Sequence, residues 1–83
     1  MKHATAPALD RLEPLLKRIR RHTALKEKSR GVFYLKSRSF LHFHEDPLGL
    51  FADLGMGDDF VRYPVNSKAE RDMFLKKLTA LLG

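Results

Sequence analysis

The chain has 83 residues, no cysteine and a formal net charge of +6 at pH 7. This length provides one domain with one hydrophobic core. The lack of cysteine excludes disulfide bonds, thiolate metal sites and thiol catalysis. The apolar runs are too short to span a membrane, and the first residues lack the apolar segment of a signal peptide, so we expect a cytoplasmic protein with no membrane partner.

The charge is distributed unevenly. Residues 1–38 hold 11 Lys/Arg against 3 acids, whereas residues 39–83 hold 5 bases against 7 acids. A basic first half favours an acidic partner, such as nucleic acid or an acidic protein, although a solvated helix face has the same composition.

The first elements are an arm and a helix. Residues 1–8 are short and polar enough to predict a loose N-terminal arm. Apolar residues then recur at spacings of three and four, which predicts a helix from about Asp10 to Ala24. Asp10 and Glu13 suit a capping box, but Pro14 lacks an N–H, so the regular helix begins either near Asp10 or at Pro14. The stripe is Leu9, Leu12, Leu16, Ile19 and Thr23, and the cations beside it are Lys17, Arg18, Arg20 and Arg21.

After a polar connector over residues 26–31, the period of the pattern changes to two. Aromatic and β-branched residues predict strands over 32–36, 40–44, 50–54 and 60–65. Ser37-Arg38 is a candidate hairpin loop, Asp46-Pro47-Leu48-Gly49 fits a type I turn, and residues 55–59 form another turn. Pro64 cannot donate to a ladder, so the last strand is expected at an edge or to end there.

The final helix is the clearest element. Ser67 and Glu70 form a capping box, an apolar arc runs from about Lys68 to Leu82, and Gly83 suits the stop. The predicted fold is therefore a two-layer α+β domain of order α-β-β-β-β-α, with a four-stranded antiparallel meander and both helices on one face.

Alternation along the strands separates two faces. One face is nearly all apolar and is the predicted core: Phe33, Leu35, Leu41, Phe43, Leu50, Ala52, Leu54, Val61, Tyr63 and Val65. The other face is mixed and carries Val32, Tyr34, Lys36, Phe40, His42, His44, Phe51, Asp53, Phe60 and Arg62.

The mixed face has too many aromatic residues for a solvated sheet surface. A helix or a second copy of the chain would cover Tyr34, Phe40, Phe51 and Phe60. Alternatively, these rings stack on the bases of a nucleic acid while Lys36 and Arg62 meet its phosphates.

His42 and His44 form the one cluster with metal-ligand chemistry. Histidines two apart on a strand project to the same side. With a carboxylate from Glu45, Asp46 or Asp53, they suit a divalent transition metal, although ordinary strand histidines have the same spacing. No other cofactor is indicated. No nucleophile or glycine-rich phosphate loop is found, so we expect no enzyme and no catalytic residue.

Three segments carry a resemblance: residues 31–36, 40–46 and 49–54. They resemble short bacterial proteins of unknown function, and the element order over residues 10–82 is similar to that of YjbR/MmcQ-like domains, which have been suggested to bind DNA, and to small iron-chaperone-like domains. The resemblance implies nucleic acid before other anions and brings no catalytic residue.

Three functions stay open on the sequence. The first is a non-enzymatic binding or accessory module that contacts nucleic acid or another anionic partner through the basic helix and the mixed face. The second is a divalent-metal-binding domain that uses His42 and His44. The third is a structural homodimer or interaction subunit.

Overall fold

The computed structural model describes residues 2–83. Its elements are, in chain order, β1 (Lys2–His3), α1 (Ala6–Ile19), β2 (Leu25–Ser29), β3 (Val32–Leu35), β4 (Arg38–Asp46), β5 (Gly49–Met56), β6 (Asp59–Pro64) and α2 (Lys68–Leu82). This confirms the α+β class, with more strands than the four that the sequence predicted.

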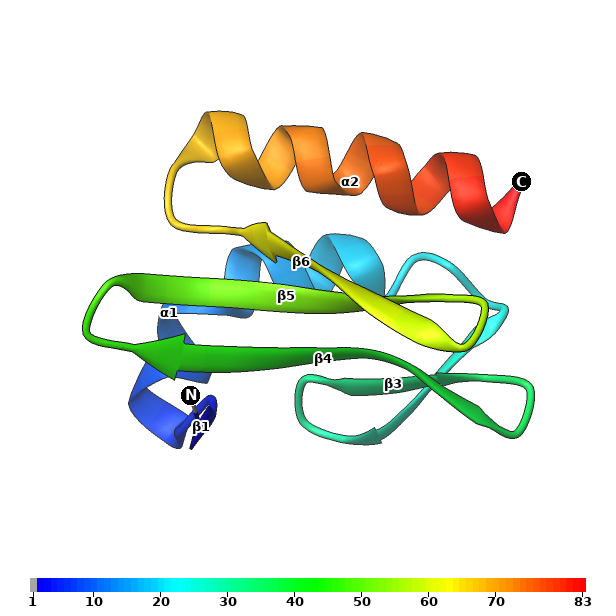
Figure 1. Ribbon diagram of the computed structural model, residues 1–83, viewed down its shortest axis with the longest axis horizontal. Helices are drawn as coiled ribbons and strands as arrows, with labels where there is room; N and C mark the ends of the chain where they lie inside the picture. The colour runs from blue at the N-terminus through cyan, green and yellow to red at the C-terminus, as the bar shows by residue number, and fades with distance from the viewer. Residues whose placement is uncertain (1) are drawn as a thin grey trace.

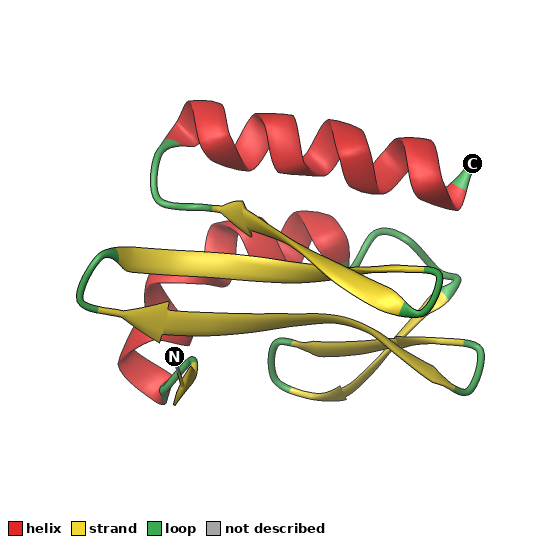
Figure 2. Cartoon of the chain, viewed as in Figure 1, coloured by secondary structure: helices red, strands yellow, loops and turns green. Residues whose placement is uncertain are grey.

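The sheet is an antiparallel meander in the order β2-β3-β4-β5-β6. The short strand β1 pairs with the end of β4, and this pairing places His3 of β1 opposite His44 of β4. Figures 1 and 2 show the long β4–β5 hairpin at the centre, with β1 beside the end of β4. The two edges of the meander are β2 and β6.

Helix α1 begins earlier and ends earlier than predicted. Thr5 is its N-cap, and Pro7 lies in the first turn. The N–H groups of the first turn have no partner within the helix, so the N–H that proline lacks costs no hydrogen bond there. Pro14 lies inside the helix instead of at its start. The helix tolerates Pro14 because the packing of its apolar face outweighs the low helix propensity of one residue. The buried residues of this face are Ala8, Leu12, Leu15, Leu16 and Ile19.

The arm and the connector both contain strands that were not predicted. Residues 2 and 3 pair with β4, and residues 6–8 belong to α1; Met1 lies outside the described residues. The polar segment 25–29 is β2, an edge strand whose charged side chains are usual where one side of a strand lacks a neighbour. Glu27 faces α1 and accepts a 2.7 Å hydrogen bond from Arg20. Because this inward position is charged, the segment shows no apolar alternation from which a strand could be predicted.

The hairpins follow the predicted turns closely. Leu48 N–H donates to Asp46 Oδ1 at 2.8 Å in the β4–β5 turn. The β3–β4 loop is Lys36-Ser37, one residue earlier than predicted, with Lys36 at φ 58°. Pro64 ends the edge strand β6, as predicted.

Helix α2 matches its prediction. The Glu70 N–H donates to Ser67 Oγ at 3.1 Å, and the Ser67 N–H donates to Glu70 Oε1 at 3.1 Å. Gly83, at φ 83°, donates its N–H to the carbonyl of Thr79. Neither helix in the described part of the chain is long and apolar enough to cross a membrane.

Both helices pack on the predicted apolar face. The buried cluster joins the α1 stripe to Phe74, Leu75 and Leu78 of α2 and to most of the predicted sheet core: Phe33, Leu41, Phe43, Leu50, Ala52, Leu54 and Val65. Leu35 and Tyr63 are partly buried, whereas Val61 is 39% exposed because it lies on the edge strand. The opposite side, the mixed face, has no helix over it, and we call it the open face.

Candidate metal centre

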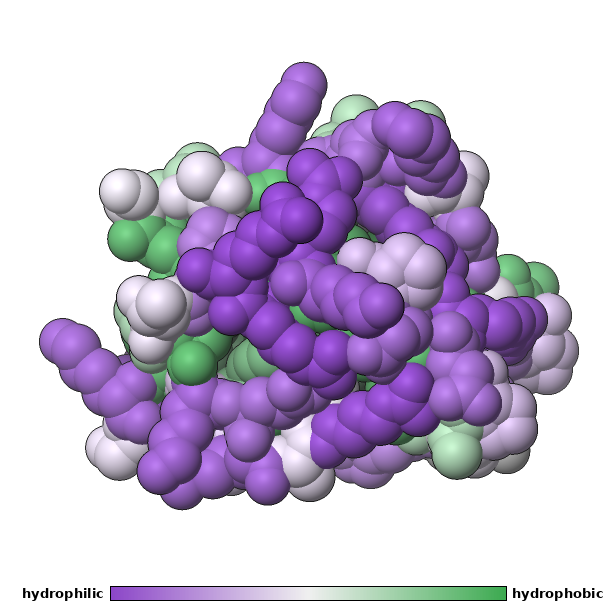
Figure 3. Space-filling model, turned by 180° about the vertical axis from the view of Figure 1, so that it is seen from behind, coloured by the Kyte–Doolittle hydropathy of each residue, from purple (hydrophilic) through white to green (hydrophobic). Residues whose placement is uncertain are grey.

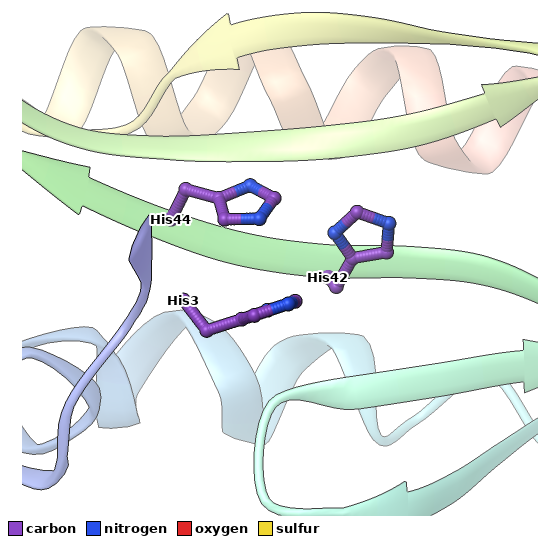
Figure 4. A group of neighbouring side chains, drawn as sticks. All are labelled: His3, His42 and His44. Carbon is purple, nitrogen blue, oxygen red and sulfur yellow. The ribbon is translucent and has the colours of Figure 1, made fainter. Parts of the chain in front are cut away.

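Three histidines lie together on the open face. His42 and His44 project from the same side of β4, and His3 is brought beside His44 by the β1–β4 pairing. The ring centroids are 4.6 Å apart for His3 and His44, 5.0 Å for His42 and His44, and 5.9 Å for His3 and His42. Figure 4 shows the rings gathered in front of β4, on the side away from α1, with a ring nitrogen of His42 directed toward the His44 ring.

The three rings offer ligand atoms at short range. One nitrogen of each histidine lies within 4.8 Å of those of the other two. The Nδ1 atoms of His42 and His44 are buried, and neither has a hydrogen-bond partner among the described residues. Buried side-chain nitrogens in folded proteins are almost always paired, so the Nδ1 of His42 calls for an explanation, whereas that of His44 has a carboxylate close by.

Asp53 lies behind the rings on the neighbouring strand, directly opposite His42 in the register of β4 and β5. Its Oδ2 is 2.9 Å from His44 Nδ1, an ion-pair distance without the alignment of a hydrogen bond, and 4.0 Å from His42 Nδ1. Arg62 on β6 holds both carboxylate oxygens, at 2.7 Å from Nε and 2.8 Å from the second guanidinium nitrogen. The carboxylate is therefore held in place by Arg62 and presented to the two imidazoles.

Burial and neighbouring charge set the protonation of this group. Burial lowers the pKa of both His42 and His44 below the ordinary histidine value, although the Asp53 carboxylate opposes this shift. The hydrogen bonds from Arg62 lower the pKa of Asp53 against the effect of its burial. At neutral pH the arrangement is two neutral imidazoles beside an ionised carboxylate whose charge Arg62 balances.

His3 differs from the other two because it is exposed and comes from the short strand β1. The chain after it is attached to β4 by two hydrogen bonds, from Ala4 N–H to the Phe43 carbonyl at 3.0 Å and from Thr5 N–H to Glu45 Oε1 at 2.6 Å. These bonds place His3 over the other rings and leave it the most adjustable member of the group.

The predicted anion-binding residues do not form one surface. Arg20 binds Glu13 at 2.6 Å and Glu27 at 2.7 Å, and Arg18 lies 3.4 Å from Asp72. With the exposed Lys17 and Arg21, these cations belong to the helix side, which Figure 3 shows to be mostly hydrophilic. Arg62 is on the open face but bound to Asp53, and Lys36 is exposed in the β3–β4 loop.

The predicted aromatic contacts are only partly available. Phe40 is 9% exposed and belongs to the core cluster, next to an irregularity in the pairing of β3 with β4. Tyr34 and Phe51 are half-buried on the open face. Phe60 is 44% exposed, with its ring 4.8 Å from that of His42.

Sequence reasoning missed His3 as a partner of His42 and His44. Its neighbour in space is about 40 positions away, and residues 2–3 show no strand pattern of their own. It also placed Asp53 among three alternative carboxylates; of these, Asp53 lies beside the rings, Glu45 accepts from Thr5 N–H, and Asp46 accepts from Leu48 N–H.

Comparison with models of protein families, with curated proteins and with solved structures finds no match for this chain. The resemblance to YjbR/MmcQ-like domains therefore stays a prediction.

Proposed function

We propose that this protein binds a transition-metal ion of the zinc class through His3, His42 and His44. The proposal is carried by the convergence of three imidazole nitrogens within 4.8 Å, together with the buried Nδ1 of His42, which has no hydrogen-bond partner in the described chain. A metal bound at this group would account for the presence of three clustered imidazoles on one small sheet face.

The spacing suits such an ion after a small adjustment. A tetrahedral zinc ion about 2.0–2.1 Å from each nitrogen requires nitrogens about 3.4 Å apart. Closing the longest separation, which is at most 4.8 Å, needs a shift of up to about 1.4 Å, which side-chain rotation within the group can supply.

Asp53 and Arg62 lie beside the histidines on the neighbouring strands and support the site. Metal-binding histidines commonly have a carboxylate at the ring nitrogen that does not bind the metal, which orients the ring and raises its basicity. Asp53 stands 2.9 Å from His44 Nδ1 and is itself held by Arg62, so it is positioned to orient His44 rather than to bind the ion directly. Three nitrogen ligands leave a fourth position for water or an external ligand.

The donor set also selects among metals. Imidazole nitrogens suit Zn²⁺, Cu²⁺, Ni²⁺ and Fe²⁺, whereas Mg²⁺ and Ca²⁺ prefer oxygen ligands. The site as described offers three nitrogens and one carboxylate already bound by arginine. We therefore expect Zn²⁺ to bind and Mg²⁺ to leave the protein unaffected.

The test is a titration of metal-free protein with Zn²⁺ in competition with a chromophoric chelator. We expect one ion per chain and weaker binding in each of the variants His3→Gln, His42→Gln and His44→Gln. His22→Gln is the matched control, because His22 lies in the loop after α1 and outside the cluster. Absence of zinc binding, or equal weakening by His22→Gln, would refute the proposal.

A further inference from the structure

We infer that the open face binds single-stranded nucleic acid, with bases stacked on Phe60 and Tyr34 and phosphates held by Lys26 and Lys28. This surface extends beyond the histidine group, and its binding does not depend on the proposed metal.

Aromatic rings are available on one side of the molecule. Phe33, Phe43 and Phe74 are buried at 1–2% exposure, Phe40 is in the core cluster, and Tyr63 is packed against it. The remaining rings, Tyr34, Phe51 and Phe60, all lie on the open face, where the register places them on β3, β5 and β6.

These rings extend across most of the sheet. From Tyr34 on β3 to Phe60 on β6 the path crosses three strand spacings of about 4.8 Å, which is about 14 Å. Sheet platforms of this width stack two or three bases of a single strand, whereas a duplex hides the base faces. On the helix side of the described chain, the one partly buried Phe or Tyr ring, that of Tyr63, is packed against Phe74 and the core, so this side suits backbone contact.

The charge next to Tyr34 is positive. Lys26 is paired with Tyr34 in the register of β2 and β3, and Lys28 Nζ lies 5.4 Å from the centre of the Tyr34 ring. Because Lys28 Nζ lies over the ring face, a base stacked on that face of Tyr34 would displace this ammonium group and bring its own phosphate next to it. Of the carboxylates around the face, Asp53 is bound by Arg62 and Asp58 lies 3.6 Å from Arg38, whereas Asp59, next to Phe60, is exposed.

A second copy of the chain is the alternative occupant, because a two-fold interface places the same patch on both partners. Lys26 and Lys28 lie on β2, whereas the exposed Asp58 and Asp59 lie at the β5–β6 turn, so self-packing is decided by the sedimentation test below. A polyanion with flat, stackable groups satisfies both the rings and the lysines.

The experiment is fluorescence anisotropy of labelled thymidine and uridine oligomers of about 12 nucleotides, with metal-free protein in the presence of a chelator. We expect Phe60→Ala to weaken binding roughly 5- to 150-fold, the usual effect of losing one base–aromatic stack. Lys26→Gln with Lys28→Gln should reduce the slope of log affinity against log salt by about 1.4, which corresponds to two lost single-strand phosphate contacts.

The matched control is the double variant Lys76→Gln with Lys77→Gln, which removes two exposed lysines from α2 on the other layer. It should change the affinity far less than the Lys26/Lys28 pair. Phe60 is exposed, so its alanine variant should keep the thermal stability of the parent.

Several results would overturn the inference. These are absence of oligomer binding, full binding by Phe60→Ala, equal loss in the Lys76/Lys77 control, or equal affinity for a duplex of the same length. Sedimentation at micromolar concentration gives an independent check, because a dimer that Phe60→Ala dissociates would show that a second copy occupies the face.

Discussion

Replacing His3 by glutamine should separate metal binding at three histidines from binding at the two on β4. At a free zinc concentration about 100 times the dissociation constant, binding to the folded state alone adds about 2.7 kcal/mol of stability. For a domain of this size, each kcal/mol moves Tm by about 4–8 °C, so zinc should raise Tm by about 11–22 °C.

The loss of zinc affinity in His3→Gln follows from the number of ligands that remain. Removing one of three first-coordination ligands should cost at least the roughly 100-fold that loss of an outer partner can cost. At the same zinc concentration the variant would be about half saturated, leaving about 0.4 kcal/mol and a Tm shift of about 2–3 °C. The measurement is the melting curve of each protein with and without zinc.

Amide hydrogen exchange tests whether zinc bound to His3 stabilises the pairing of β1 with β4. Ala4 N–H is bonded to the Phe43 carbonyl and follows His3 directly, so it exchanges when β1 leaves β4. If His3 binds the ion, opening of β1 must first break that bond, and exchange at Ala4 should slow by about 50-fold at the same zinc concentration. The reasoning fails if zinc binds with unchanged exchange at Ala4, or if His3→Gln keeps the full Tm shift.

Three further outcomes concern stability and are measured by urea or thermal unfolding. Leu41→Ala, at a fully buried position of β4, should cost about 2–5 kcal/mol, and a cost below 1 kcal/mol would contradict the described core. Ser67→Ala should cost about 1 kcal/mol by removing the cap of α2, while Ser67→Thr should retain most of it. Hydrogen bonds from Arg30 and Arg20 lower the pKa of Glu13 to about 2. The ionised Glu13 therefore stabilises the folded state above about pH 4.5, and this stabilisation is lost as the pH falls through about 2. Glu13→Gln should lower Tm at pH 7 and have a smaller effect on Tm near pH 2. A difference in Tm between variant and parent that is constant with pH would refute this assignment.

Elements with a strong local pattern were predictable. The capping box and apolar arc of α2 lie within one segment, and the alternation of β4 and β5 correctly assigned Leu41 and Leu54 to the core and His42 and Asp53 to the other face. A side-chain period of two is a property of the strand backbone, so it holds before any neighbour is known.

Elements whose pattern depends on a partner were not predictable. Strand β2 lacks an apolar residue at position 27, because Glu27 fills this inward position and binds Arg20 at the end of α1. Strand β1 has two residues, which are too few for a period. Both strands exist because a neighbour with unpaired backbone groups was available, and that neighbour is known only after the chain has folded.

The amino-acid sequence by itself determined the class of fold, the division of the sheet into an apolar and a mixed face, and the placement of His42 and His44 on one side of a strand, since each of these follows from local periodicity. Only the tertiary structure brought His3 to that pair, placed Asp53 and Arg62 behind it, and separated the basic helix from the aromatic face. These contacts join residues on different strands, and their geometry depends on register and on helix packing, which local spacing does not contain.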